Sequence, residues 1–229
     1  MIEDYKDRKI IAYSDFATIV EDVGFMPLSN NRIGFINLDI LTESKQWHTD
    51  LPSDPWPWRM KIESDHKAAY AKLFDKKPGF ISVGWYPKFL AARRDGRSFS
   101  RMYSEGLMSN YAKRIYDLFK DHEILAAHEI KALGGFTKET NAKYESAMSE
   151  LQMAMFITVN GSKQKISSKG EPYGWPSTAY STVEMWAGEE IMDEANSILS
   201  EDAKDEILKR IREFAPEPPK ARLKAFTGF

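Results

Sequence analysis

The spacing of apolar residues along the chain predicts several amphipathic helices. Apolar side chains recur at helical intervals between Ser14 and Gly24, a pattern typical of a capped helix. The positions are Phe16, Ile19, Val20 and Val23. Residues 63–73 and 85–94 are also expected to be helical, the second opened by Pro87, with a turn at residues 78–79 between them.

Between these helices the pattern changes. Short extended pieces are expected within residues 32–41, where helical periodicity is lost. Residues 54–59 (DPWPWR) predict a loop, because a residue that precedes proline avoids the helical region.

The C-terminal part is expected to be helical and to end in a tail. Apolar stripes within residues 180–186 and 203–214 predict two helices, the second capped by Ser200. Residues 216–219 contain three prolines, which end that helix. The last ten residues are therefore predicted to be loosely attached.

Residues 107–166 predict three helices followed by a β-hairpin. Ser109 is expected to cap the first helix, residues 125–133 form the second, and the third begins near Thr137. A β-rich run then leads to Asn160-Gly161, a strong hairpin-turn signal. This is the order of a winged helix-turn-helix, whose third helix enters a groove of DNA while the hairpin touches phosphate.

The fold class predicted from these patterns is α+β and mainly helical. Residues 1–104 are expected to form an N-terminal α+β segment, for which a second, degenerate winged helix is one interpretation. Residues 105–187 are expected to form the winged helix, and residues 188–229 the C-terminal helices and tail.

Composition excludes several kinds of chemistry. The 229 residues include no cysteine, so disulfides, thiol catalysis and Cys-rich zinc sites are excluded. The four histidines lack metal-binding spacing, and no glycine-rich phosphate motif is present, so neither a metal nor a nucleotide cofactor is expected. The acidic start and the absence of a long apolar run predict a cytoplasmic protein that does not enter a membrane.

Charge is distributed unevenly, although the net charge is only −2. Residues 59–101 hold 11 basic and 4 acidic residues, whereas residues 1–58 and 171–229 each carry a net charge of −5. A basic centre between acidic ends is typical of a protein that presents one face to nucleic acid. The alternative is a solvated surface helix whose lysines pair with the acidic ends.

The basic cluster suggests a phosphate clamp. Guanidinium groups bind phosphate through parallel hydrogen bonds, and four arginines lie within nine residues. Lysines of the third helix and of the hairpin are further candidates for contact with double-stranded DNA. The predicted DNA-binding residues are Arg93, Arg94, Arg97, Arg101, Lys138, Lys163 and Lys165.

A second candidate site lies in the tryptophan-rich segment. His48 and Asp54 can act as a general acid–base pair beside a pocket that stacks a flipped base. The alternative is a packed lid in which Arg59 pairs with Asp54. The residues expected to line a stacking pocket are Trp47, Trp56, Trp58, Trp85 and Trp175.

Several segments resemble the AlkZ-type DNA glycosylases, bacterial enzymes built from tandem winged helices that release bulky alkylated bases. Residues 151–161 (LQMAMFITVNG), with Tyr173 and Pro176, are similar to the C-terminal winged helix of that family. A group of short AlkZ-related proteins is more similar. Its members carry versions of residues 46–49 (QWHT), 54–59 (DPWPWR), 85–87 (WYP) and 173–176 (YGWP).

The resemblance also implies a catalytic position. The glycosylases carry Gln-x-Gln or Gln-x-Asp near the N-terminus, and the similar stretch here is residues 34–39 (GFINLD). On an extended segment Asn37 and Asp39 share a face, so that the carboxylate can activate water and the amide can hold it. Asparagine replaces glutamine and is one methylene shorter. The alternative is that both residues make turn or strand-edge hydrogen bonds.

Three hypotheses about function follow. The first is a DNA-binding winged-helix protein related to alkylated-base glycosylases, with duplex DNA as its partner. The second is an active glycosylase or another pocket enzyme that uses Asp39 with Asn37, or His48 with Asp54. The third is a protein-interaction scaffold, because a fold alone does not confer a function.

Overall fold

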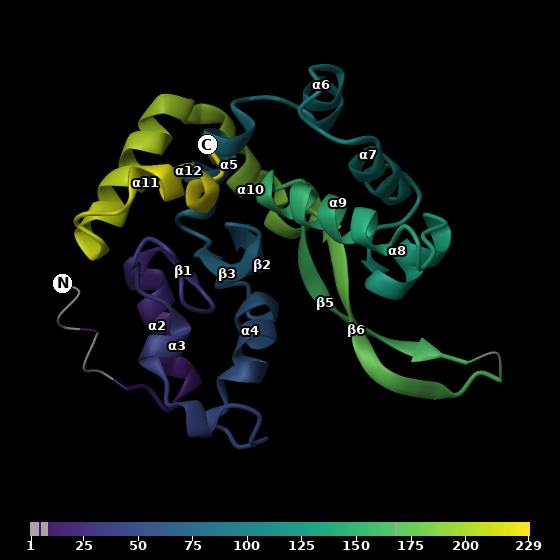
Figure 1. The fold of residues 1–229 in the computed structure, drawn as a ribbon, viewed down its shortest axis with the longest axis horizontal. Helices are drawn as coiled ribbons and strands as arrows, with labels where there is room; N and C mark the ends of the chain where they lie inside the picture. Colours follow the sequence, from purple (N-terminus) through teal and green to yellow (C-terminus); the bar gives the residue numbers. More distant parts are fainter. Residues whose placement is uncertain (1–4, 6–8, 168) are drawn as a thin grey trace. The chain divides into compact units, whose positions relative to one another are not determined.

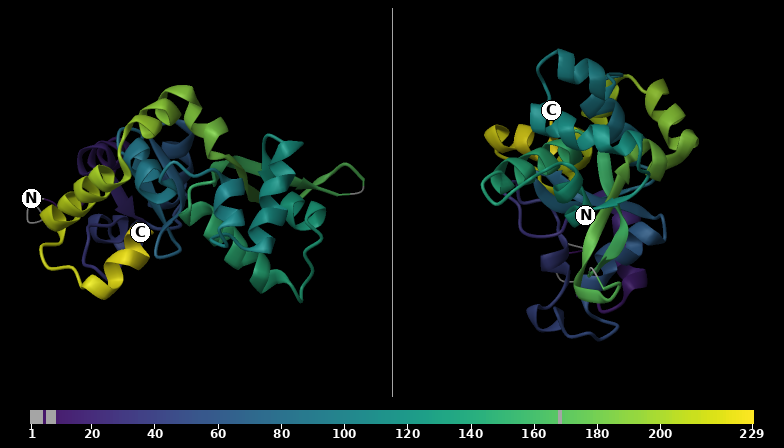
Figure 2. Two further views of the ribbon diagram at one scale, coloured as in Figure 1. Left: turned by 90° about the horizontal axis from the view of Figure 1, so that it is seen from above. Right: turned by 90° about the vertical axis from the view of Figure 1, so that its right-hand side faces the viewer.

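The computed structural model describes Tyr5 and residues 9–167 and 169–229, which divide into two units (Figures 1 and 2). Unit 1 contains the chain up to Gly96 together with Glu190–Phe229, and unit 2 contains Arg97–Glu189. This grouping differs from the three parts expected from the sequence, because residues 97–104 fall in unit 2 and residues 190–229 fall in unit 1.

Unit 1 contains helices around a three-stranded antiparallel sheet with strand order β1-β3-β2. Phe80 of β3 pairs with Met26 on one side and Tyr70 on the other. The elements are α2 (Tyr13–Val23), β1 (Phe25–Pro27), α3 (Leu38–Leu41), η1 (Ser44–Gln46), α4 (Pro55–Ser64), β2 (Ala68–Phe74), β3 (Lys77–Ser82), α5 (Tyr86–Arg94), α11 (Ser200–Phe214) and α12 (Lys220–Thr227). The helix α10 (Val183–Ser197) begins in unit 2 and ends in unit 1, with a non-helical residue at Gly188.

Aromatic rings fill the core of unit 1. Phe25 stacks on Phe35 with ring centroids 5.0 Å apart and meets Phe89 edge-on at 4.9 Å. All three side chains are buried. Much of the aromatic content therefore packs the interior of this unit.

The first helix is confirmed, but residues 63–73 do not form one helix. Helix α4 ends at Ser64, and Ala68–Phe74 is strand β2. Almost every residue of β2 is buried, and a continuously apolar run does not distinguish a strand from a helix by periodicity. The turn predicted at residues 78–79 lies instead at Asp75-Lys76, where both residues have positive φ.

Two further local predictions were wrong because a polar side chain begins a helix. Asp54 accepts a hydrogen bond from the amide of Trp56, so α4 starts where a loop was expected. Asn37 accepts one from the amide of Ile40, and α3 follows in place of an extended piece.

The C-terminal residues are not a loose tail. Residues 220–227 form α12, in which Phe226 and Thr227 are buried. The ring of Phe226 stacks on that of Phe74 with centroids 4.8 Å apart. Burial of this phenylalanine against β2 explains why the segment packs on unit 1 despite three prolines before it.

Unit 2 contains helices and a second antiparallel sheet of strand order β4-β6-β5. Its elements are α6 (Phe99–Ser104), α7 (Asn110–Tyr116), η2 (Asp117–Lys120), β4 (Leu125–Ala126), α8 (Ala127–Leu133), α9 (Asn141–Met153), β5 (Ile157–Ile166) and β6 (Pro172–Thr182). Ser109 caps α7 as predicted, accepting from the amide of Ala112 at 3.1 Å. Tyr144, Met148 and Leu151 of α9 pack in the core.

The hairpin of unit 2 is longer than predicted. Asn160-Gly161 lies within β5, where the pairing register with β6 shifts between Val159 and Ser162. Gly161 has φ 76°, as a bulge allows, so the strand continues through the expected turn. The two strands project beyond the helices of this unit, as both views show (Figures 1 and 2).

The two units share one order of elements. In unit 1 the order α2, β1, α3, α4, β2, β3 gives the sheet β1-β3-β2. In unit 2 the order α7, β4, α8, α9, β5, β6 gives the sheet β4-β6-β5. The sequence shows no internal repeat, so this likeness is visible only in the folded chain.

The packing of α12 gives a first prediction. We expect Phe226→Ala to lower the free energy of unfolding of unit 1 by about 3–5 kcal/mol, because it removes a buried ring from contact with Phe74. Urea denaturation followed by tryptophan fluorescence measures the change. Lys224→Ala, exposed on the same helix, is the control and should change the value by less than about 0.5 kcal/mol. Equal effects of the two variants would contradict the docking of α12.

Candidate functional site

The side chain of Asn37 forms hydrogen bonds with the backbone of neighbouring residues. Its side chain is 2% exposed, its Oδ1 accepts from the amide of Ile40 at 3.2 Å, and its Nδ2 donates to the carbonyl of Phe35 at 3.3 Å. The amide is therefore used in capping α3, as the turn interpretation of the motif predicts. The extended geometry expected for Asn37 and Asp39 is wrong, since α3 begins between them.

Asp39 lies in the first turn of α3, at the surface. Partial burial raises the pKa of its carboxyl above the ordinary value, and a hydrogen bond from the backbone of Asn30 opposes this shift. Of the proposed pair, only Asp39 presents a group that can act on a ligand.

Asp54 is a buried helix cap. It is 2% exposed, its Oδ1 accepts from the amide of Trp56 at 2.9 Å, and its Oδ2 accepts from the amides of Thr49 at 2.8 Å and Asp50 at 3.2 Å. Burial raises the pKa of this carboxyl, but the backbone hydrogen bonds outweigh burial and hold it below the ordinary value.

The proposed pairing of His48 with Asp54 is not formed. The oxygens of Asp54 are occupied by backbone amides, and the exposed ring of His48 lies beside Trp56, with centroids 5.0 Å apart. The guanidinium of Arg59 lies over the same indole, 3.8 Å from the ring centroid of Trp56. The segment is thus a packed structure, although its arginine stacks on Trp56 where the lid interpretation had it pair with Asp54.

The predicted stacking tryptophans have different environments. Trp58 is buried and donates to the carbonyl of Pro52, and Trp47 donates to Oγ1 of Thr42 at 3.0 Å. Trp85 is half-buried against Gly24, where a Cβ would lie 2.4 Å from its indole nitrogen. Trp56 is 40% exposed and Trp175 is 89% exposed. The first three therefore do not line an open pocket within unit 1.

Arg93 and Arg94 are buried, so they do not offer a phosphate clamp. Arg93 is 5% exposed and donates from Nε to the carbonyl of Thr227 at 2.7 Å and from a terminal nitrogen to that of Leu73 at 2.6 Å. Burial lowers the pKa of its guanidinium, and the two carbonyl oxygens that accept its hydrogen bonds stabilise the buried charge. Arg93 joins α5 to β2 and α12.

The other members of the basic cluster are paired with acids. In unit 2, Arg97 and Arg101 both contact Glu105, at 3.5 Å and 2.9 Å. In unit 1, Lys88 contacts Glu206 of the acidic C-terminal region at 2.6 Å. The contact of Lys88 agrees with the alternative interpretation that lysines of this segment pair with the acidic ends, whereas Glu105, the partner of Arg97 and Arg101, lies outside those ends.

The hairpin of unit 2 brings together three of the predicted contact residues. Lys163 and Lys165 lie on β5 and Trp175 lies on β6. Lys163 contacts Glu129 of α8 at 2.9 Å, at an exposed position. Lys138 is exposed just before α9 in the same unit. The sequence predicted the two lysines on the hairpin, whereas Trp175 was predicted as a stacking residue outside it, because the turn was expected at residues 160–161.

Comparison with known proteins defines the class. The chain belongs to the AlkZ-related family, whose model matches residues 10–228. A solved structure that it matches is the Streptomyces sahachiroi DNA glycosylase AlkZ, with a TM-score of 0.46 and 11% identity over 98% of this chain and 61% of that chain. The chain thus spans less than two thirds of AlkZ. No curated protein sequence matches it.

The described residues hold neither a metal-ligand cluster nor a helix that could span a membrane. Within residues 9–167 and 169–229, no three His, Asp or Glu side chains are grouped as metal ligands. None of the helices described has the length and apolar character needed to cross a bilayer.

Sequence reasoning missed a cavity of unit 1 whose basic residues, Arg32, Lys77 and Arg222, come from three distant segments. No motif signals such a convergence.

The capping role of Asp54 gives a second prediction. We expect Asp54→Ala to lower the free energy of unfolding by about 1–2 kcal/mol at pH 7, because three amides lose their acceptor. The folded-state pKa is lowered, so the charge of Asp54 stabilises the fold above about pH 4, the ordinary range of an aspartate. This contribution is lost as the pH falls through the folded-state pKa.

The measurement is urea denaturation of wild type, Asp54→Ala and Asp54→Asn between pH 7 and pH 3. The gap between wild type and either variant should narrow below about pH 4. Asp205→Asn, exposed on α11, is the control and should change stability by less than about 0.5 kcal/mol. A gap that is constant over this range would mean that the carboxylate is not the stabilising form.

Proposed function

We propose that this protein binds double-stranded DNA through unit 2, as a winged-helix relative of DNA glycosylases. The observation that carries the proposal is the β5–β6 hairpin, which places Lys163, Lys165 and the exposed Trp175 together. Membership of the AlkZ-related family supports a link to DNA repair.

The order of elements supports a winged helix. In unit 2, helices α7, α8 and α9 precede a hairpin whose strands join the short strand β4 from between α7 and α8. In such modules the third helix enters a groove and the hairpin lies along the backbone. Helix α9 holds the third position, and the exposed Ala142 and Ser146 would allow close approach to a duplex. Unit 1 has the same order and is proposed as a second, degenerate copy.

The charges of the hairpin suit a phosphate contact. Lys163 pairs with Glu129 at a solvent-exposed site, where an ion pair contributes little to stability. Phosphate can therefore replace Glu129 at low cost. Lys165 faces Tyr173 across the strands and contacts no acid within the described residues.

The test is the salt dependence of duplex binding, measured by anisotropy of a labelled oligonucleotide between 50 and 200 mM salt. We expect affinity to fall steeply with salt, and Lys165→Ala to reduce the log–log slope by about 0.9. Trp175→Ala should weaken binding without changing the slope, because an indole carries no charge.

The control is Lys120→Ala, a lysine of unit 2 that already pairs with Asp117 at 2.7 Å. It should leave the affinity and the slope unchanged. Absence of duplex binding at low salt would remove the proposal and would favour the protein-interaction scaffold. If Lys165→Ala leaves the slope of log affinity against log salt concentration unchanged, Lys165 does not contact the DNA phosphates.

A second candidate function is base excision that uses Asp39. The observation in its favour is the raised pKa of this carboxyl, since perturbed carboxyls are suited to general-base chemistry. Asn37 is committed to capping α3, so Asp39 would act without the amide partner implied by the resemblance.

The matching prediction concerns abasic sites in alkylated duplex DNA. If Asp39 is the general base, Asp39→Asn should slow the formation of abasic sites by about 100-fold or more. The control is Asn37→Ala, which should lower stability by about 1 kcal/mol and leave the rate per folded molecule unchanged. Equal rates in wild type and Asp39→Asn would exclude Asp39 as the base.

A further inference from the structure

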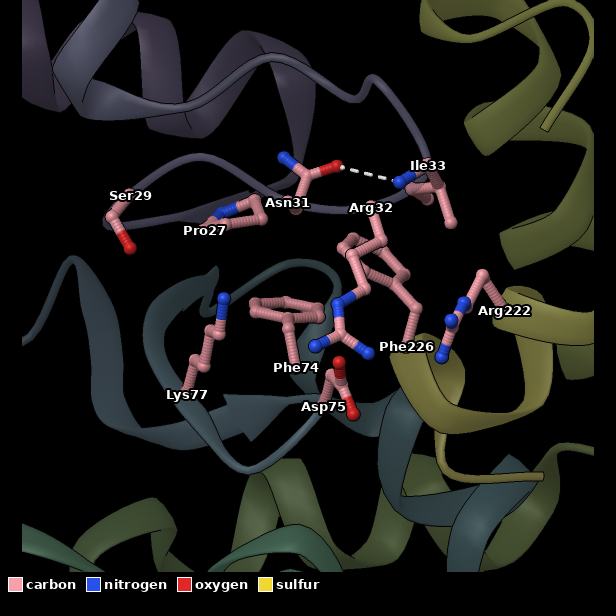
Figure 3. Close-up of a pocket in the computed structure, with 10 residues that line it drawn as sticks. All are labelled: Pro27, Ser29, Asn31, Arg32, Ile33, Phe74, Asp75, Lys77, Arg222 and Phe226. Atoms are coloured by element: carbon pink, nitrogen blue, oxygen red, sulfur yellow. Dashed lines mark hydrogen bonds between the residues drawn. The ribbon is translucent and has the colours of Figure 1, made fainter. Parts of the chain in front are cut away.

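Unit 1 contains a small solvent-open cavity that no motif accounts for (Figure 3). It lies where the loop after β1, the β2–β3 turn and α12 meet. The lining residues are Pro27, Ser29, Asn31, Arg32, Ile33, Phe74, Asp75, Lys77, Arg222 and Phe226.

The apolar residues of the lining belong to the core of unit 1. Pro27, Ile33, Phe74 and Phe226 are buried, and the rings of Phe74 and Phe226 stack on each other. An apolar wall lowers the local dielectric constant, so a charge held against it interacts more strongly with the groups around it than in open water.

The polar part of the lining carries a surplus of positive charge. Arg32, Lys77 and Arg222 are exposed at the cavity, and Asp75 is the one acidic residue among the lining residues. Figure 3 shows the three cationic side chains around the aromatic rings, with the carboxylate of Asp75 beside the guanidinium of Arg32. Three cations and one carboxylate leave a net charge of +2.

These cations differ from others in the same unit. Lys88 and Arg210 each contact a carboxylate at 2.6 Å. Within the described chain, Arg32, Lys77 and Arg222 make no hydrogen bond and no ion pair shorter than 4.0 Å. With one carboxylate among three cations the repulsion between like charges is only partly offset, and a bound anion relieves it.

The segments that carry the cations are held in place. The amide of Asn31 donates to the carbonyl of Phe35 at 2.7 Å, and its oxygen accepts from two backbone amides of the same loop. The amide of Asp75 donates to the carbonyl of Ala225 at 2.9 Å, which joins the β2–β3 turn to α12. The site is therefore organised before a ligand arrives.

We infer that this cavity binds a phosphate monoester. Two guanidinium groups supply paired donors for phosphate oxygens, and the ammonium of Lys77 supplies a further charge. The net charge of +2 suits a phosphate monoester, which carries about two negative charges at pH 7, better than a backbone diester, which carries one. The source is either a free nucleotide or the 5′-phosphorylated end of a DNA strand.

The experiment uses titration calorimetry of the full chain with deoxyadenosine 5′-monophosphate, deoxyadenosine and inorganic phosphate. We expect the monophosphate to bind and deoxyadenosine not to bind. Arg222→Gln should weaken binding by at least about tenfold, and Lys224→Gln, exposed on the same helix outside the cavity, should not change it. Asp75→Asn should strengthen binding, because it removes the one negative charge and asparagine tolerates the positive φ of this position.

A second arm separates the two sources and the two proposals. In the Lys163→Ala/Lys165→Ala variant, a 5′-phosphorylated duplex should bind at least about tenfold more tightly than its 5′-hydroxyl counterpart if the ligand is a DNA end. If the monophosphate alone binds, the ligand is a free nucleotide. The inference is overturned if no phosphate-bearing probe binds more tightly than its phosphate-free counterpart, or if Arg222→Gln and Lys224→Gln behave alike. Either result leaves duplex binding through the hairpin to be decided separately.

Discussion

The buried guanidinium of Arg93 is the constraint on which the structure of unit 1 depends. A charge removed from water must be fully hydrogen-bonded, and Arg93 obtains its partners from the carbonyls of Leu73 on β2 and Thr227 on α12. These residues lie far apart in the sequence, so one side chain joins the end of the chain to the first sheet. This contact and the stacking of Phe226 on Phe74 together hold α12 in place, and with it Arg222 and the cavity wall. An arginine that looked like a ligand for phosphate is thus part of the interior.

Short polar side chains in the candidate catalytic segments are used in a similar way. Asn37 and Asp54 accept hydrogen bonds from amides at helix starts, where backbone donors have no partner within the helix. Asn37 and Asp54 are therefore used in capping, whereas the carboxyl of Asp39 is not.

The two units show how one arrangement of elements can serve different purposes. In unit 1 the β2–β3 hairpin ends in the two-residue turn Asp75-Lys76, which is bonded to α12 and forms part of a cavity. In unit 2 the β5–β6 hairpin continues beyond the bulge at Gly161, and its strands project beyond the helices of that unit (Figures 1 and 2). Trp175 of this hairpin is exposed, and Lys163 pairs with Glu129 of α8. The length and packing of the hairpin, more than the topology, therefore distinguish the surfaces of the two units.

The sequence by itself determined the features that depend on neighbouring residues. It predicted the α2 helix ending at Gly24, the Ser109 cap, the stripe of α9 and the existence of a basic hairpin, since helical spacing and capping act within a few residues. Only the tertiary structure decided that β2 is a strand, that Arg93 is buried and that α12 packs on the first sheet. Strand β2 pairs with its neighbour β3, but its nearly continuous burial hides the strand period. The burial of Arg93 and the packing of α12 depend on partners distant in the chain, and local periodicity carries no information about which distant segment will bury a residue or accept its hydrogen bond.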